Sequence, residues 1–195
     1  MTSLQQSPTP ELPPARLGPP KDRTLVLVGL MGVGKTSIGK RLAQALHLPF
    51  RDADSEIEAA AGRTIADIFA ERGEAEFREG ERRVISRLME EPPHVLATGG
   101  GAFLRPETRA LILQKVLAIW LKADLAVLAR RVARKNTRPL LVGRDPLEVL
   151  TIQAEARYPI YAEAHVTVET GDVPHSAAVD AVIKAITDHA RSARA

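Results

Sequence analysis

The chain has 195 residues, a length that favours one domain with a sizeable core, and its 45% hydrophobic and 26% charged residues are ordinary for a globular protein. No apolar run approaches the roughly 18 residues of a membrane span, so we expect no membrane association. Cysteine is absent, which excludes a disulfide framework and thiolate chemistry and fits a cytoplasmic location. The formal net charge of +3 is weak support for a nucleic-acid partner, and the five histidines are too scattered for the spacings of a zinc site.

The first 22 residues differ in composition from the rest of the chain. They are poor in large apolar side chains and rich in proline: Pro8, Pro10, Pro13, Pro14, Pro19 and Pro20. Such a segment cannot bury enough apolar surface to offset its ordering entropy, so residues 1–22 are predicted to be a disordered tail. A dispensable extension is the simpler interpretation, and a docking or regulatory arm is the alternative. Residues 23–195 are predicted to form a single domain.

Short apolar runs alternate with amphipathic stretches through that domain. The runs predict strands at 24–28, 49–52, 95–98, 116–121 and 165–168. The amphipathic stretches predict helices at 35–46, 55–61, 64–89 (broken near Gly73), 106–113, 124–133, 146–162 (kinked at Pro159) and 176–192. Strands separated by helices indicate an α/β fold of three layers, in which helices cover both faces of a parallel sheet.

Residues 29–36 read GLMGVGKT and match the phosphate-loop pattern G-x-x-x-x-G-K-S/T in full. A buried strand is predicted before the loop and an amphipathic helix after it, which is the context that the motif requires. Glycine lets the backbone approach phosphate oxygens, and the lysine is placed to reach the β- and γ-phosphates. The predicted nucleotide-binding residues are Gly32, Val33, Gly34, Lys35, Thr36 and Ser37. The motif does not identify a reaction, because switch GTPases, ATPases and metabolite kinases share it.

Two carboxylates, Asp52 and Asp54, follow the second predicted strand. Alternation along an extended segment would put both on the side that faces the cleft at the sheet's carboxyl edge. Asp52 could then help to hold Mg²⁺ through water, together with the Thr36 hydroxyl. Asp54 could accept a hydrogen bond from an acceptor hydroxyl or remove its proton. Helix capping or plain surface charge is the alternative for both residues.

Two arginines and a glycine turn are further candidates on the acceptor side. Arg78 lies in a helix rich in glutamate, where ion pairing along the helix face is the simpler interpretation. Gly99, Gly100 and Gly101 directly follow a predicted strand and would allow close backbone approach to a ligand. Arg157 has no position that the sequence pattern alone defines.

The stretch 134–145 is basic and poorly suited to a long helix, which suits a mobile lid over phosphates. Arg138 within it could stabilise charge on the transferring phosphoryl group when the lid closes. A nucleic-acid patch is the competing interpretation. Because the chain has only four Phe, two Tyr and one Trp, it lacks the aromatic side chains that such patches interleave with arginine.

In their order, these motifs resemble the shikimate kinase family over nearly the whole chain from about residue 24. The resemblance rests on GLMGVGKT, the D-x-D pair at Asp52, the E-F-R of Arg78, the G-G-G turn, the R-P-L-L of Arg138, and Arg157 with Tyr161 after it. It implies a nucleoside-monophosphate-kinase-like P-loop fold with a five-stranded parallel sheet and a lid. It also implies the reaction of ATP with shikimate to give ADP and shikimate 3-phosphate, a step in chorismate and aromatic amino-acid synthesis.

The resemblance also implies a role for each acceptor residue. Arg78 and Arg157 would clamp the shikimate carboxylate, for which guanidinium geometry is well suited. Asp54 would bind ring hydroxyls, and the glycine turn at 99–101 would offer the backbone amide of Gly100.

On the nucleotide side, the resemblance implies that Lys35 and Arg138 stabilise the phosphoryl group in flight. Thr36 and Asp52 would organise Mg²⁺, and Arg131 would stack on adenine, with Pro174 as a weaker candidate opposite it. ATP and shikimate are the expected partners of a monomeric enzyme, with no nucleic acid and no membrane. A gluconate-kinase-like enzyme, and a nucleotide-binding module without catalysis, are the alternatives.

Overall fold

The computed structural model describes residues 22–134 and 144–193. Helices and strands alternate along this part of the chain, as the hydrophobic periodicity predicts. The elements are β1 (Leu25–Val28), α1 (Lys35–Leu46), β2 (Phe50–Asp52), α2 (Ala53–Ala61), α3 (Ile65–Leu88), β3 (Val95–Ala97), the 3-10 helix η1 (Ala102–Leu104), α4 (Pro106–Lys115), β4 (Leu117–Lys122), α5 (Leu125–Ala133), α6 (Pro146–Tyr161), β5 (Val166–Glu169) and α7 (His175–Ser192).

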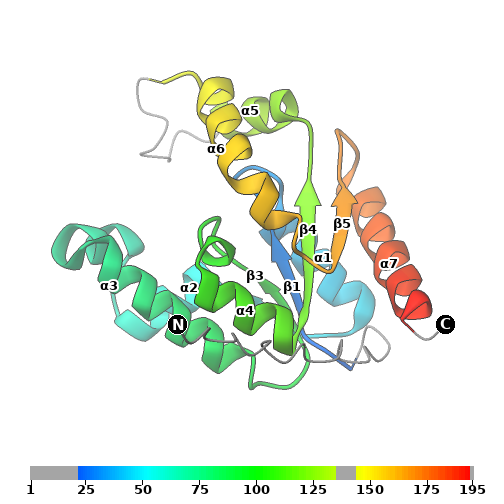
Figure 1. Cartoon of the computed structure of the whole chain (residues 1–195), viewed down its shortest axis with the longest axis horizontal. Helices are drawn as coiled ribbons and strands as arrows, with labels where there is room; N and C mark the ends of the chain where they lie inside the picture. Colours follow the sequence, from blue (N-terminus) through cyan, green and yellow to red (C-terminus); the bar gives the residue numbers. More distant parts are fainter. Residues whose placement is uncertain (1–21, 135–143, 194–195) are drawn as a thin grey trace, which may run out of the picture.

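The five strands form one parallel sheet in the order β2-β3-β1-β4-β5 (Figure 1). β1 is the central strand, and its Leu25 pairs with Val95 of β3 on one side and with Leu117 of β4 on the other. All four residues of β1 are buried, which explains why its sequence is continuously apolar instead of alternating. The predicted α/β fold with a five-stranded parallel sheet is confirmed.

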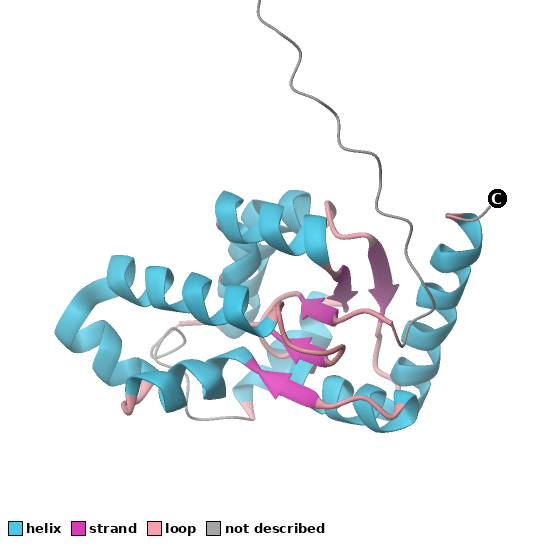
Figure 2. Ribbon diagram, turned by 90° about the horizontal axis from the view of Figure 1, so that it is seen from below, coloured by secondary structure: helices cyan, strands magenta, loops and turns pink. Residues whose placement is uncertain are grey.

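Helices cover both faces of the sheet. α1 and α7 pack against each other on one face, and α4 and α6 lie over the other (Figures 1 and 2). α1 buries Ile38, Leu42 and Leu46, the stripe that a 3.6-residue period selects. No helix among residues 22–134 and 144–193 is both long and apolar enough to cross a membrane.

α2 and α3 project beyond the β2 edge of the sheet as a helical unit (Figure 1). A small apolar cluster of Ile57, Ile68 and Phe77 holds the two helices together, separate from the main core. Gly73 interrupts α3 with φ 78° and ψ 175°, outside the helical region, at the position where the break was predicted. The unit thus consists of three helical segments around a core of their own.

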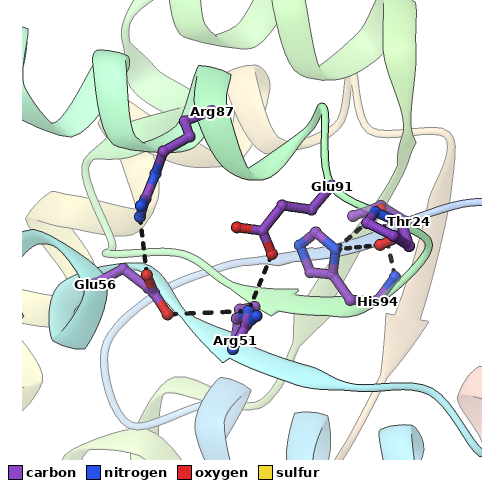
Figure 3. Close-up of polar contacts among 7 residues, drawn as sticks. Thr24, Arg51, Glu56, Arg87, Glu91 and His94 are labelled. Carbon is purple, nitrogen blue, oxygen red and sulfur yellow. Dashed lines mark hydrogen bonds and ion pairs between the residues drawn. The ribbon is translucent and has the colours of Figure 1, made fainter.

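Ion pairs fasten this helical unit to the sheet (Figure 3). Arg51 of β2 pairs with Glu91 at 3.2 Å and lies 3.9 Å from Glu56 of α2. Glu56 in turn accepts a hydrogen bond from Arg87 of α3 at 2.9 Å. One exposed pair contributes only about 0–1 kcal/mol, but this network joins β2, both helices and the segment after α3.

Beside this network, the start of β1 is tied to the start of β3. Thr24 Oγ1 and His94 Nδ1 lie 3.3 Å apart, and the amide of Leu25 donates to the His94 carbonyl at 2.9 Å (Figure 3). Both polar side chains are buried. Because the amino ends of the two strands are level, the segments that leave their carboxyl ends lie side by side.

Two local features differ from the expected pattern. η1 was not predicted, since one 3-10 turn is too short to show a hydrophobic period. α2 begins at Ala53 instead of residue 55, because the Asp52 side chain caps it. α6 continues past Pro159, as predicted, and ends at Tyr161, with Pro159 in its last turn.

Thr64 caps α3. Its hydroxyl accepts the amide of Asp67 at 3.1 Å and donates to the Asp67 carboxylate at 2.6 Å. A reciprocal capping box would instead place the acidic side chain on the Thr64 amide. Aspartate is one methylene shorter than glutamate, which explains why it stops at the hydroxyl.

Gly29 and Gly62 offer a matched test of the packing at the end of β1. A Cβ on Gly29, whose φ is 140°, would lie 2.4 Å from the Leu121 carbonyl oxygen, whereas a Cβ on Gly62, whose φ is 62°, would meet nothing within 4 Å. We expect Gly62→Ala to lower the free energy of unfolding by about 1 kcal/mol, and Gly29→Ala to lower it by at least about 3 kcal/mol. Urea denaturation measures both, and equal losses would contradict the importance of the Leu121 contact.

Candidate active site

A cleft of about 590 Å³ opens at the carboxyl ends of the strands, where open α/β sheets bind ligands. The phosphate loop and the first turn of α1 form one wall, and the start of α2 and the glycine turn after β3 form another. The ends of α5 and α7 close the far side. The lining residues are Met31, Gly32, Gly34, Lys35, Thr36, Ser37, Asp52, Asp54, Thr98, Gly99, Gly100, Arg131, Val132, Arg134 and His175.

The phosphate loop leaves β1 and turns directly into the N-terminus of α1. Gly32 (φ 82°) and Gly34 (φ 95°) have left-handed backbone, and Gly34 is an N-cap with no side-chain hydrogen bond. The amides of the first helical turn are therefore available to an anion at the positive end of the helix dipole. Lys35 Nζ donates to the carbonyl oxygens of Gly29 at 2.8 Å and Leu30 at 3.1 Å, which holds its charge over the loop.

Asp52 joins the phosphate loop to the acceptor side. Its Oδ2 accepts the Thr36 hydroxyl at 2.8 Å, and its Oδ1 accepts the amide of Asp54 at 3.1 Å as the N-cap of α2. The explanation by strand alternation is wrong, because β2 ends at Asp52 and Asp54 already lies in α2. The cap brings both carboxylates into the cleft, so capping and a role in the site are compatible.

The carboxylate of Asp54 lies among several charges. Burial raises the pKa of Asp54 above its ordinary value, because it disfavours the charged form, and the negative charge of Asp52 raises this pKa further. Lys35 opposes the rise, as Arg78 does more weakly. A raised pKa makes Asp54 a better proton acceptor once it is ionised.

The glycine turn, residues 99–101, lies where charged side chains from three elements converge. A Cβ on the first glycine would lie 2.8 Å from Asp54 Oδ1, and a Cβ on the third would lie 2.6 Å from Arg78 Nη1. A Cβ on the middle glycine would lie 3.8 Å from Arg157 Nη1. None of the three has a positive φ. A Cβ on the first or third glycine would force Asp54 or Arg78 to shift, whereas a Cβ on the middle glycine would make only an ordinary van der Waals contact.

Arg78 of α3 is held by two carboxylates on its own helix. Nη1 pairs with Glu81 at 2.9 Å and Nη2 with Glu74 at 3.3 Å. Glu81 is only 2% exposed, and burial raises its pKa while Arg78 lowers it. The helix-face ion pairing considered for Arg78 is present, and the same guanidinium faces the glycine turn.

Arg157 of α6 reaches the turn together with Tyr161, one helical turn later. The Tyr161 hydroxyl donates to the Gly100 carbonyl at 2.6 Å. Burial raises the pKa of Tyr161, and the neighbouring Arg157 lowers it. The tyrosine ring is 1% exposed and packs near Phe103 and Trp120, so the core fixes the backbone of the turn.

At the α5–α7 end of the cleft, Arg131 Nη2 donates to the Gly171 carbonyl at 3.0 Å. His175 lines the cleft here, whereas Pro174, the N-cap of α7, is not among the lining residues. Burial lowers the pKa of His175, and the charges of Arg41 and Arg131 lower it further, which favours the neutral imidazole. The heterocyclic base of a nucleotide bound at this end would contact the guanidinium of Arg131 from α5 and the imidazole of His175 from α7.

Most of the predicted site residues therefore line one cleft. Arg78, Gly101 and Arg157 adjoin it through the glycine turn. Val33 differs, because its side chain is fully buried in the core and only its backbone can face a nucleotide. Arg138 lies outside the described residues.

Three residues of the site were not predicted to act there. Glu81 is three positions from Arg78 on one helix, and Tyr161 is four positions from Arg157, so helical spacing could have indicated both pairs. His175 had no comparable signal, because its position follows from the packing of α7 beside the phosphate loop.

Comparison with known proteins gives a consistent result. The family model described as shikimate kinase matches residues 31–187. A shikimate kinase from Caulobacter vibrioides is 66% identical over 170 residues, which cover 87% of this chain and 85% of that protein. The structure of shikimate kinase from Acinetobacter baumannii in complex with shikimate superposes with a TM-score of 0.80 at 35% identity, covering 85% of this chain and 93% of that one.

A gluconokinase from Sinorhizobium meliloti is a more distant structural neighbour. It superposes with a TM-score of 0.55 at 19% identity, over 88% of this chain and 95% of that one. At this level of identity the similarity shows a shared fold alone.

Asp54 allows a test that links the site to stability. Because folding raises its pKa, ionised Asp54 destabilises the folded chain at neutral pH. We expect Asp54→Asn to increase the free energy of unfolding near neutral pH. The increase should shrink as pH falls through the folded-state pKa of Asp54 and disappear below the lower pKa of the unfolded chain, where the carboxyl is neutral in both states.

Chemical denaturation from mildly acidic to neutral pH measures this difference. Glu155→Gln, at an exposed position of α6, is the control for loss of one negative charge. A pH-independent effect of Asp54→Asn, or a loss of stability at neutral pH, would contradict the electrostatic account.

Proposed function

Because the chain belongs to the shikimate kinase family, we propose that its cleft transfers the γ-phosphate of ATP to the 3-hydroxyl of shikimate, giving ADP and shikimate 3-phosphate. The product belongs to chorismate and aromatic amino-acid synthesis. The protein is thus an ATP-dependent phosphotransferase with an alcohol group as acceptor.

The arrangement around the glycine turn is the observation that carries the proposal. Asp54, Arg78 and Arg157 come from different helices, and each lies against one glycine of the turn beside the phosphate loop. Two guanidinium groups suit one carboxylate, and a carboxylate suits a hydroxyl group. A ring that carries both groups would therefore be held with a hydroxyl towards the donor phosphate.

The donor half of the cleft fits a nucleoside triphosphate. We assign the phosphates to the loop amides, to the first turn of α1 and to Lys35, which would exchange its contacts with the loop carbonyls for phosphate oxygens. Arg131 is the candidate for stacking on adenine. The expected gain in rate comes from positioning and charge stabilisation, because phosphoryl transfer needs little covalent participation by the protein.

Thr36 and Asp52 are suited to hold Mg²⁺ with the nucleotide. Their oxygens lie 2.8 Å apart and are the hard ligands that Mg²⁺ prefers. Within the described ranges, no group of three or more His, Cys, Asp or Glu side chains could hold a metal alone. This fits an ion that arrives with the phosphates, and when bound it would neutralise charge between the β- and γ-phosphoryl groups.

Asp54 would accept a hydrogen bond from the acceptor hydroxyl. This bond would orient a lone pair of the hydroxyl oxygen towards the γ-phosphorus. It need not remove the proton early, because a loose transition state puts little demand on the nucleophile. Its raised pKa suits it to take up the proton as the new O–P bond forms.

Other parts of the assignment extend beyond the described residues. We propose that 134–145 forms a lid that brings Arg138 to the transferring group, and that residues 1–22 are a tail outside the catalytic domain at 23–195. We further propose a cytoplasmic monomer with no nucleic-acid or membrane partner.

A kinase acting on gluconate is the principal rival, since a gluconokinase shares the fold. A coupled assay of ADP release with Mg·ATP separates the two functions when shikimate and gluconate are compared as acceptors. AMP serves as a third acceptor, which neither function uses. We expect turnover with shikimate at least about 1,000-fold above that with gluconate, because a site built for one set of hydroxyl groups leaves its polar groups unpaired with another. ATP binding without shikimate-dependent turnover would refute the assignment.

The two arginines Arg78 and Arg82 allow a matched test of the carboxylate clamp. Both lie in α3 and pair with a glutamate three residues away, but only Arg78 faces the glycine turn. Arg78→Lys keeps a cation beside Glu81 and loses the planar fork, so we expect the shikimate KM to rise about 10- to 100-fold with the ATP KM nearly unchanged.

Arg82→Lys should leave both KM values unchanged. An Arg78→Lys variant with normal shikimate KM but lower thermal stability would show that Arg78 is only structural. A parallel rise in the ATP KM would show a general distortion of the cleft.

A further inference from the structure

A second cavity, of about 370 Å³, opens between α2 and α3 and shares no lining residue with the active-site cleft. α2 and α3 form the helical unit that projects from the β2 edge of the sheet (Figure 1). The volume of the cavity is in the range of small-molecule sites, roughly 300–1,000 Å³. Nothing in the proposed reaction uses it.

Apolar side chains form the base of this cavity. Ile57, Ile68 and Phe77 are at most 7% exposed, and Val84 packs against them. The ring of Phe77 also lies against the ring of Phe69, with centroids 4.5 Å apart. The base therefore offers aliphatic side chains and one aromatic ring, on which a flat apolar group could stack.

Gly80 leaves space on the α3 side of the cavity. It lies within a regular stretch of α3, and a Cβ built on it would meet nothing within 4 Å. Glycine inside a helix is less stable than alanine, and here neither a positive φ nor a close contact requires it. A larger side chain would project into the cavity, so the glycine keeps this volume open.

Three guanidinium groups surround the opening. Arg63, Arg72 and Arg83 line the cavity together with a single carboxylate, Glu76. Each of the three arginines has a glutamate partner: Arg63 pairs with Glu71, Arg72 pairs with Glu76 at 2.7 Å, and Arg83 lies 3.8 Å from Glu79. Exposed pairs of this kind are weak and can be exchanged for a ligand anion. A ligand carboxylate would bind here by replacing one of these glutamates on its arginine.

We propose that the α2–α3 cavity is a binding site for a small carboxylate with a flat apolar body. The apolar group would lie on Phe77 and the isoleucines beside Gly80, and the carboxylate would meet the arginines at the opening. A polyphosphate suits this cavity poorly, because its base has no hydrogen-bond donors comparable to the phosphate loop.

The cavity is connected to the acceptor side of the active site by its own helices. α2 begins at the Asp52 cap and carries Asp54 in its first turn. Phe77, at the base of the cavity, directly precedes Arg78 on α3. A ligand that changes the spacing of α2 and α3 would therefore move Asp54 relative to Arg78.

The binding test uses the full chain and naphthalene-1-acetate as the probe, with the uncharged naphthalene-1-acetamide as its control. Titration is followed by calorimetry and by methyl NMR of the isoleucines. We expect saturable binding of the acetate, binding of the amide weaker by about tenfold, and shifts at Ile57 and Ile68 on the base of the cavity.

Two pairs of variants locate the probe. Gly80→Leu fills the cavity and should weaken binding by at least about tenfold, whereas Gly80→Ala adds one methyl group and should raise thermal stability with little loss of binding. Arg83→Gln should weaken binding, and Arg82→Gln, on the same helix outside the cavity, should not.

Absence of saturable binding would overturn the proposal, as would equal affinity for the acetate and the amide. Binding that survives Gly80→Leu would place the probe elsewhere and would also overturn it. If Gly80→Leu instead changes the oligomeric state seen by light scattering, the cavity belongs to a contact between copies, and the proposal is wrong.

Coupling to the cleft rests on the proposed function and is measured separately. Saturating probe should change the shikimate KM at least about twofold with little effect on the ATP KM. An unchanged KM together with normal binding would contradict the coupling. Absence of shikimate turnover without probe would instead refute the catalytic assignment, so the two failures are distinguishable.

Discussion

The close approach of three charged side chains to one glycine turn is the constraint on which the site depends. Asp54, Arg78 and Arg157 belong to three helices; a Cβ on the first or third residue of the turn at 99–101 would crowd Asp54 or Arg78, and Arg157 lies at ordinary contact distance from the middle residue. Tyr161 fixes the turn from the core by its hydrogen bond to the Gly100 carbonyl. The position of the acceptor site is thus determined by backbone that the core holds in place, and the helices supply its charges.

This arrangement concentrates like charges, and stability is lost as a result. Asp54 and Glu81 both have a raised pKa, chiefly because of burial; the charge of Asp52 raises the pKa of Asp54 further, and the charge of Asp54 raises that of Glu81. Arg78 and Lys35 offset this only in part. A ligand anion on the phosphate loop, or a ligand carboxylate on Arg78 and Arg157, would change the pKa values of Asp54 and Glu81. Carboxylates that destabilise the folded chain are the groups that would orient a hydroxyl and take up its proton.

The fold and the donor half of the site could be predicted from the sequence because their signals are local. A continuous apolar run predicted β1, and the complete phosphate-loop motif predicted the loop at 29–36. The apolar stripe with a 3.6-residue period predicted α1. The acceptor half could be predicted from the residues only as separate candidates, and the family resemblance was needed to connect them. Contacts between distant segments, such as His175 with the phosphate loop or Asp54 with the turn, have no short-range pattern. The Asp52–Asp54 pair was predicted for the wrong reason. The prediction assumed that the strand continues through Asp54, whereas α2 begins at Ala53.

The two halves of the site also differ in how they are held. The donor half is the phosphate loop, which directly follows β1, and the residues of β1 are almost completely buried at the centre of the sheet. The acceptor half depends on α2 and α3. Ala53, Ile85 and Leu88 anchor these helices in the main core, and the Arg51–Glu56–Arg87 network joins them to the β2 edge (Figure 3). Their outer part has only the small cluster of Ile57, Ile68 and Phe77 as its core, so this part can shift at small free-energy cost. A kinase needs this asymmetry: the donor phosphate has to be held in a fixed geometry, whereas the acceptor side has to admit a ring, close on it and release the product.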